Sequence, residues 1–277
     1  MTCLPAQCAS APQTAYLEAG DGETILLLHG SAATGAMWRG LMAVLQLLYR
    51  VVAPDLIGYG KSAAWPADTA FGLDDETRAI APLLPGCGDS YHLVGYSYGG
   101  AVALSLALAN PARVRTLTLI EPVFVAALRS GGDQAAFDQF SRIGDDFRAT
   151  VAHDPAGAME LFLAFWIGEG AWARLPAAAQ ADMLQLAAKI GLDWQAVFAA
   201  DPDPRRLGVL GERTLLVRGD QSPAPMLRLV DTLHRLMPGS THAIVPEAGH
   251  LLPVTHGAAL TDALLAHLHA DAERRLR

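Results

Sequence analysis

The sequence predicts an α/β fold with a doubly wound, mostly parallel sheet and an inserted helical cap. Short apolar runs alternate along the chain with longer runs of helical period, which is typical of parallel strands joined by crossover helices. The run 24–28 is almost entirely apolar, as expected of a strand that helices cover on both faces. The alternation stops after residue 121 and resumes near residue 209, so a separate segment is inserted between two strands of the core.

The core comprises residues 1–121 and 209–277. Before the insertion we expect strand 24–28, helix 36–48, strand 50–53, helix 72–84, strand 90–95, helix 98–109 and strand 114–120. After it we expect strand 214–218, helix 225–236, strand 241–245 and helix 256–273. Pro111 ends the helix 98–109, because proline has no backbone N–H with which to continue it. Residues 14–19 are also strand-like and precede strand 24–28.

The inserted segment, residues 122–208, is expected to form the helical cap. It holds seven of the eight Phe and three of the five Trp residues. Its apolar residues recur at spacings of three and four, as in Met159, Phe162 and Trp166, which is the period of a helix face. Most of its aromatic side chains fill the cap's own interior, and the rest line a substrate pocket that excludes bulk water. The residues expected to line this pocket are Trp166, Phe165 and Trp172.

A serine lies at a tight turn between a predicted strand and a predicted helix. Residues 95–99 have the pattern Gly-x-Ser-x-Gly, with Ser97 at its centre. Gly95 and Gly99 lack the Cβ atoms that would collide where strand and helix nearly touch. Such a bend presents the hydroxyl to a substrate, with the helix N-terminus beneath it, so Ser97 is a candidate nucleophile.

A nucleophilic serine needs a base, and the base needs an orienting carboxylate. Asp220 follows the predicted strand 214–218, and His250 follows the strand 241–245. Loops at the carboxyl ends of parallel strands gather around ligands, and the order Ser, acid, His suits this type of fold. We therefore predict a catalytic triad of Ser97, Asp220 and His250. Glu121, which follows strand 114–120, is the alternative acid.

Two segments upstream of the serine turn also carry short sequence motifs. His29-Gly30-Ser31 follows the first parallel strand, and residues 55–62 have the sequence Asp-Leu-Ile-Gly-Tyr-Gly-Lys-Ser. With the serine turn, the late Asp and the late Gly-His, they resemble the α/β-hydrolase superfamily, in its serine-nucleophile, cap-bearing, esterase-like branch. The resemblance extends over nearly the whole chain, with a variable region in the middle.

The resemblance implies specific roles for several residues. The oxyanion hole would consist of the backbone N–H groups of Ser31 and Tyr98, which are fixed before the reaction and each contribute about a hundredfold or more in rate. Asp220 occupies the usual position of the acid and has the shorter side chain found there, which favours it over Glu121. His29 would be a structural hydrogen-bonding residue. The antiparallel hairpin that usually opens the fold would be abbreviated.

The resemblance also implies an activity. We expect a serine hydrolase that cleaves a carboxylic ester of a small or medium apolar substrate through an acyl-enzyme, with no metal and no organic cofactor. The nearest alternative is a carbon–carbon bond hydrolase of diketone-type substrates, whose usual Gly-Pro-Gly-rich oxyanion loop and Asn-Ser-Met elbow differ from the segments 31–35 and 96–98. Epoxide hydrolases and haloalkane dehalogenases use an Asp nucleophile, against which Ser97 argues. A non-enzymatic ligand receptor or scaffold is an alternative of another class, since fold alone does not set function.

Composition narrows the partners and the compartment. Twenty basic and 28 acidic residues give a formal charge of −8, which argues against nucleic acid and against anionic lipid surfaces. No apolar run approaches the ~18 residues of a membrane span. Cys3, Cys8 and Cys87 are an odd number without metal-ligand spacing, so we expect free thiols and a cytoplasmic location, with no signal peptide. A small-molecule substrate is the expected partner, and the oligomeric state stays open.

Overall fold

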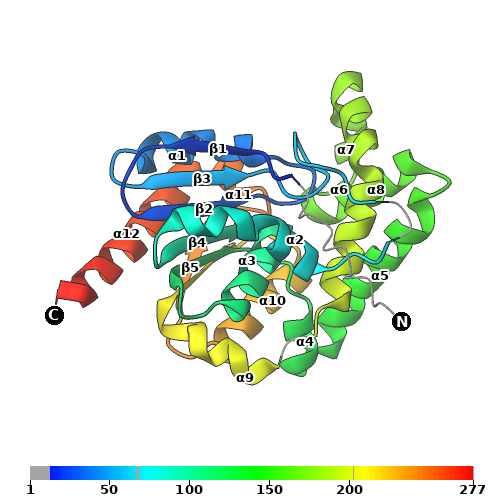
Figure 1. Ribbon diagram of the computed structural model, residues 1–277. Coiled ribbons are helices and arrows are strands. Elements are labelled where there is room, and N and C mark those ends of the chain that lie inside the picture. The colour runs from blue at the N-terminus through cyan, green and yellow to red at the C-terminus, as the bar shows by residue number, and fades with distance from the viewer. Residues whose placement is uncertain (1–12, 67–68, 202, 277) are drawn as a thin grey trace, which may run out of the picture.

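A seven-stranded sheet forms the centre of the chain (Figure 1). The computed structural model describes residues 13–66, 69–201 and 203–276. In their spatial order the strands are β1 (Tyr16–Ala19), β3 (Arg50–Pro54), β2 (Thr24–Leu28), β4 (Tyr91–Tyr96), β5 (Val114–Ile120), β6 (Thr214–Gly219) and β7 (Thr241–Val245). β1 pairs antiparallel with β3, and the other pairs are parallel. The predicted fold class is confirmed, and the opening antiparallel hairpin is reduced to β1.

Helices cover both faces of the sheet. One face packs against α1 (Arg39–Leu45) and α12 (Gly257–Leu276), and the other packs against α2 (Leu73–Ile80), α3 (Tyr98–Ala109) and α10 (Ala224–Leu236). Successive residues of β2 alternate between these layers: Ile25 and Leu27 join the first, Leu26 and Leu28 the second. Side chains of a strand point alternately to its two faces, so a strand covered on both faces must be apolar throughout.

Two of the predicted helices are divided. The predicted helix 36–48 begins as a short 3₁₀ turn, η1 (Gly35–Trp38), before α1 starts. The predicted helix 72–84 ends at Ile80, and the 3₁₀ segment η2 (Ala81–Cys87) follows it. Pro82 and Pro85 lie in η2 and cannot donate the backbone hydrogen bonds of an α-helix. Cys87 ends η2 as a buried free thiol, whereas Cys3 and Cys8 lie outside the described residues.

The segment between β5 and β6 is helical. It contains α4 (Ala126–Ser130), α5 (Gln134–Val151), α6 (Pro155–Ile167), α7 (Ala171–Arg174), α8 (Ala177–Ala199), α9 (Pro204–Leu207) and the 3₁₀ segment η3 (Gly208–Arg213). Helices α5 to α8 lie together at one end of the sheet, on the right of Figure 1. The Asp133 and Asp154 carboxylates cap α5 and α6 by accepting from the backbone N–H groups of Ala136 and Gly157. We propose that residues 122–208 form the cap, and the name is used for this segment below.

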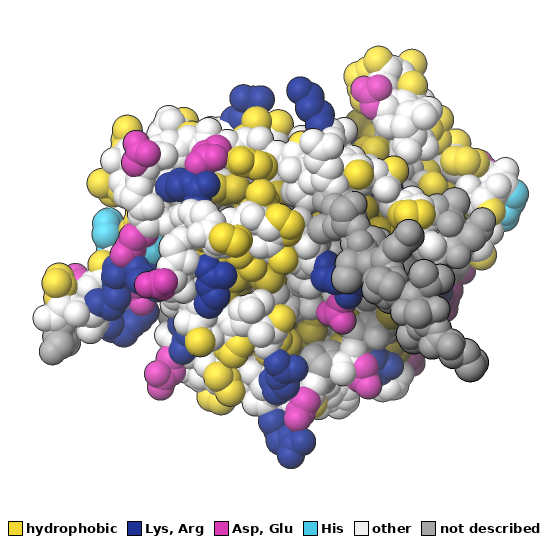
Figure 2. Space-filling view, viewed as in Figure 1, with side chains coloured by type: hydrophobic (Ala, Val, Ile, Leu, Met, Phe, Trp, Pro, Cys, Tyr) yellow, Lys and Arg dark blue, Asp and Glu magenta, His cyan; other side chains and the backbone are white. Residues whose placement is uncertain are grey.

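Charged side chains of both signs are interspersed on the face of the molecule shown in Figure 2. Charged side chains also join distant segments: Glu23, just before β2, accepts hydrogen bonds from Arg115 of β5 and Arg275 of α12. Such exposed pairs contribute little stability, typically about 0.2–1 kcal/mol each.

Across the described part of the chain, every helix is too short or too polar to cross a membrane.

Candidate active site

Ser97 lies at a strained turn between β4 and α3. Its backbone has φ 54° and ψ −120°, a conformation that L-residues rarely adopt. The flanking glycines allow this turn to form. A Cβ on Gly95 would lie 2.4 Å from the carbonyl oxygen of Gly99, and one on Gly99 would lie 2.2 Å from that of His29. The strand and helix therefore approach each other only because both residues lack a side chain, as the sequence pattern predicted.

His250 links Ser97 to a carboxylate. Its Nε2 lies 3.0 Å from Ser97 Oγ, and its Nδ1 lies 2.6 Å from Glu121 Oε2. A proton on Nδ1 donates to this carboxylate, which leaves Nε2 free to accept the serine proton. All three side chains are buried, with Glu121 fully enclosed. A hydroxyl, an imidazole and a carboxylate in this order can act as nucleophile, base and orienting acid.

The carboxylate that contacts His250 is not the one that the sequence predicted. Asp220 is exposed and does not contact His250, whereas Glu121, at the end of the adjacent strand β5, does. The other oxygen of Glu121 accepts hydrogen bonds from the backbone N–H of Gly219 at 2.8 Å and from the hydroxyl of Ser222 at 2.5 Å. The end of β6 and the loop after it thus fix the Glu121 carboxylate, which follows β5, and do not bring the Asp220 carboxylate to His250. The structure therefore brings Glu121, the alternative acid, and not Asp220 against His250, and we propose Glu121 as the orienting acid.

The residues predicted for the oxyanion hole lie beside Ser97. Tyr98 is the first residue of α3, where backbone N–H groups have no acceptor within the helix. Ser31 lies in the turn that follows β2. Ser31, Ser97 and Tyr98 together border an inner cavity of about 20 Å³, which has room for about one water molecule. The use of these N–H groups as oxyanion donors stays a prediction.

Trp166 of α6 lies directly over the imidazole of His250. The two rings are stacked, with centroids 3.9 Å apart and planes 20° from parallel. Trp166 borders the inner cavity and also an outer hollow of about 510 Å³, which His250 and Phe165 border too. The predicted pocket residue Trp172 borders neither space. Sequence reasoning missed the other apolar residues of the inner cavity, which are Val123, Phe162, Ile190, Trp194 and Val197. Ile190, Trp194 and Val197 recur at spacings of four and three on α8, which marks them as one helix face.

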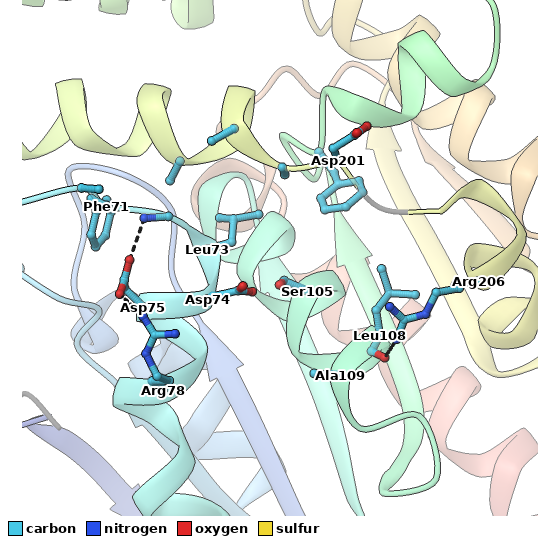
Figure 3. Close-up of a pocket in the computed structure, with 16 residues that line it drawn as sticks. Phe71, Leu73, Asp74, Asp75, Arg78, Ser105, Leu108, Ala109, Asp201 and Arg206 are labelled. Carbon is cyan, nitrogen blue, oxygen red and sulfur yellow. Dashed lines mark hydrogen bonds and ion pairs between the residues drawn. The ribbon is translucent and has the colours of Figure 1, made fainter. Parts of the chain in front are cut away.

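A larger hollow lies elsewhere. It has a volume of about 680 Å³ and is bordered by α2, α3 and the end of α8 (Figure 3). Two of its charged side chains have partners within the chain: Asp75 accepts from the backbone N–H of Gly72, and the guanidinium of Arg206 donates to the carbonyl of Leu108. Ser97, Glu121 and His250 do not border it. Size alone would therefore point to the wrong place, and the hydrogen-bonded side chains indicate the site.

Three charged side chains form a buried ionic cluster beside the inner cavity: Glu76 of α2 with Lys189 and Asp193 of α8. The Lys189 ammonium donates to Glu76 Oε1 at 3.0 Å and to Asp193 Oδ1 at 2.5 Å. Burial alone would lower the pKa of Lys189, but the two carboxylates raise it above its ordinary value, so the lysine stays protonated. The cluster links the cap to the core, and sequence reasoning missed it.

His29 has a structural role, as expected. Its Nδ1 donates to the carbonyl of Gly30 at 2.7 Å, and its Nε2 accepts from the backbone N–H of Leu56 at 2.9 Å. Burial lowers its pKa to about 4, so the ring is neutral near pH 7.

Within the described residues, no group of three His, Cys, Asp or Glu side chains is arranged to hold a metal ion.

The low pKa of His29 predicts loss of stability in mild acid. The unfolded chain binds a proton at this residue near pH 6.5, whereas the folded chain does so only near pH 4. The free energy of unfolding should therefore fall as the pH drops through this window, by about 2 kcal/mol between pH 7.5 and pH 5 from His29 alone. Urea unfolding at the two pH values measures this loss, and His29→Asn should remove that part of it. An equal loss in the variant would contradict the assignment.

Comparison with known proteins shows the family to which the chain belongs. Residues 23–257 match the family model described as alpha/beta hydrolase fold. The chain is 30% identical to the pimeloyl-[acyl-carrier protein] methyl ester esterase of Aeromonas salmonicida, over 88% of this chain and 89% of that protein. It is 34% identical to the enzyme of the same name from Aeromonas hydrophila, where the match spans 48% of this chain and about half, 52%, of the relative.

A solved structure gives the same result for the fold. An esterase from Thermogutta terrifontis superposes with a TM-score of 0.72 over 95% of this chain and 96% of that chain, at 22% identity. A likeness at this level of identity shows a shared fold alone.

Proposed function

The chain belongs to the α/β-hydrolase family, and we propose that it is a serine hydrolase that cleaves carboxylic esters of small or medium apolar substrates. One observation carries the proposal: the buried chain of hydrogen bonds from Ser97 through His250 to Glu121. The strained turn at Ser97 supports it, because such strain gathers at functional sites. The substrate is a small molecule, since the space around Ser97 is narrow.

The proposed reaction has two halves. Ser97 Oγ attacks the ester carbonyl carbon while His250 Nε2 takes the serine proton. Glu121 holds the proton on Nδ1 and stabilises the imidazolium, and the N–H groups of Ser31 and Tyr98 stabilise the oxyanion. His250 then protonates the leaving alcohol, which leaves an acyl-enzyme. A water molecule, deprotonated by His250, attacks the acyl carbon and releases the acid and free Ser97.

Steady-state turnover of p-nitrophenyl esters of increasing acyl length tests the function. We expect multiple turnovers and release of nitrophenol in step with ester consumed. An enzyme that cleaves a vinylogous diketone but no ester would be a carbon–carbon bond hydrolase instead. A protein that binds these compounds and turns over none of them would support the receptor alternative.

Trp166 is expected to set the acyl length that the enzyme accepts. The inner cavity holds about one water-sized group, so each added methylene that fits should raise kcat/KM by about threefold to fourfold, and the rise should end at short chains. Trp166→Ala removes the ring that borders both the inner cavity and the outer hollow. The limit should then move to longer chains, with a smaller effect on acetate esters.

Melting temperatures separate this role from a merely structural one. A tryptophan that only fills the cap interior would, when removed, lower the melting temperature and reduce kcat/KM by the same factor at every chain length. Trp172→Ala is the matched control, because Trp172 is a cap tryptophan that borders neither space. It should leave the length profile unchanged, and a profile shifted equally by both variants would contradict the role of Trp166.

A further inference from the structure

The buried ionic cluster is bonded to both residues of the proposed oxyanion hole. Ser31 Oγ donates to Asp193 Oδ2 at 2.6 Å, and the Tyr98 hydroxyl donates to Glu76 Oε1 at 3.2 Å. These are side-chain bonds, whereas the oxyanion would be bound by the backbone N–H groups of the same two residues. Each bond therefore restrains the position of a proposed donor without occupying it.

We propose that Asp193 is a positioning residue: by accepting the Ser31 hydroxyl, this cap carboxylate holds the Ser31 backbone N–H where the oxyanion forms. The inference rests on the proposed function and adds a condition to it. Asp193 belongs to α8 of the cap, whereas Ser31 belongs to the core. The oxyanion hole is then complete only when the cap lies against the core as it does here.

The backbone of the turn that contains Ser31 is strained and needs contacts from outside the turn to stabilise it. The next residue, Ala32, has φ 58°, a left-handed conformation that is unfavourable for a residue with a Cβ. A strained backbone persists only where its surroundings fix it. A short hydrogen bond from a hydroxyl to a carboxylate is about twice as strong as a neutral one, so the bond from Ser31 to Asp193 is suited to this task.

Asp193 is itself held rigidly. Its Oδ2 also accepts from the Tyr59 hydroxyl at 2.5 Å, its Oδ1 accepts from Lys189, and the side chain is almost fully buried. The ammonium of Lys189 lies 4.3 Å from the ring centroid of Phe71 and 4.9 Å from that of Tyr98. A carboxylate with donors from three segments cannot move far, which is what a positioning group requires.

Stability alone explains the cluster poorly. Burying two carboxylates and an ammonium removes three charges from water, and the mutual attraction seldom exceeds that cost, so apolar residues are often as stable in such places. Asp193 also borders the inner cavity beside Ser97. The cluster lies beside Ser97 and is bonded to both proposed oxyanion donors. A role in positioning these donors therefore explains it better than a contribution to the free energy of unfolding does.

Two variants test the proposal separately and together. Ser31→Ala keeps the backbone N–H but loses the bond to Asp193, and we expect kcat for p-nitrophenyl butyrate to fall about tenfold with KM changed less than threefold. Asp193→Asn should lower kcat by about ten- to thirtyfold. Because both changes remove the hydrogen bond that the Ser31 hydroxyl donates to the carboxylate, the double variant should be no more than about twofold worse than Asp193→Asn. Asp182→Asn, the same change at an exposed position of α8, is the control and should stay within about twofold of wild type.

A boronic acid that forms a tetrahedral adduct with Ser97 supplies a second readout. Its affinity should fall by the same factor as kcat in each variant, since the adduct uses the oxyanion donors and the ground-state ester uses them less. A melting temperature near that of wild type is expected for Ser31→Ala.

Wild-type kcat in Ser31→Ala, or losses that multiply in the double variant, would overturn the proposal. If Asp193→Asn fails to fold, Ser31→Ala decides alone. Wild type that binds the boronic acid but turns over no ester would contradict the proposed function, and the boronic acid affinities of the variants would still test the role of Asp193.

Discussion

Ser97→Ala should abolish ester turnover, with kcat reduced by about five to six orders of magnitude. The variant keeps the turn and the His250–Glu121 pair but has no atom with which to form an acyl-enzyme. An organophosphonate probe should add one covalent label to wild type, at Ser97, and none to the variant. Turnover of p-nitrophenyl acetate, with intact mass measured beside it, checks both results.

Ser105→Ala is the control for this experiment. Ser105 lies on the same helix α3 but borders the 680 Å³ hollow of Figure 3 and not the inner cavity. It should label and turn over as wild type does. Undiminished turnover in Ser97→Ala would contradict the proposed mechanism. In the part of the chain that the structure describes, no other hydroxyl lies within hydrogen-bond distance of His250 Nε2.

Glu121→Gln should lower kcat by about a thousand- to ten-thousandfold while the fold stays intact. The backbone N–H of Gly219 and the hydroxyl of Ser222 both donate to Glu121 Oε1. The amide oxygen of a glutamine must occupy this position, so its NH₂ group faces His250 Nδ1. The imidazole then carries its proton on Nε2 and cannot accept one from Ser97.

Asp220→Asn is the matched change for this comparison. Asp220 is exposed, and its backbone N–H donates to the carbonyl of Val245, so we expect kcat within about twofold of wild type. Kinetics of both variants at one pH, with circular dichroism to verify folding, decide between the two acids. A large loss in Asp220→Asn beside a small one in Glu121→Gln would return the acid to the loop after β6.

The strands and the serine of the candidate site could be predicted from local sequence. A buried parallel strand must be apolar, and the turn at Ser97 must have glycine on both sides, so each leaves a pattern of a few residues. The acid leaves no such pattern. Glu121 and Asp220 both follow strands that end at the same edge of the sheet, and the conformation of each turn decides which one reaches His250. Glu121 has φ 43°, and no local sequence pattern predicts this left-handed conformation for a glutamate.

The lining of the cap was harder to predict for a related reason. Helical spacing shows which residues share a face of α6, but not which face the core meets. Phe162 and Trp166 are four residues apart and both border the inner cavity, whereas the intervening Phe165 borders the outer hollow. Lys189 and Asp193 are also four apart, a spacing common for pairs on exposed helix faces. Only the packing of α8 on the core makes them a buried ionic cluster.

Trp166 borders both the inner cavity and the outer hollow, whereas Ser97 borders the inner cavity alone, and in the proposed reaction this arrangement would order the release of products. We propose that an ester bound at Ser97 has its acyl group in the inner cavity and its alcohol toward the outer hollow, which His250 borders. The alcohol would then diffuse away as soon as the proposed acyl-enzyme forms, whereas release of the acid would require the indole to turn aside. The residence time of the acid would then govern turnover at saturation, so esters of one acid with different alcohols would share a single maximal rate. The enzyme would distinguish alcohols only at low substrate concentration, when capture of the ester is the slower event.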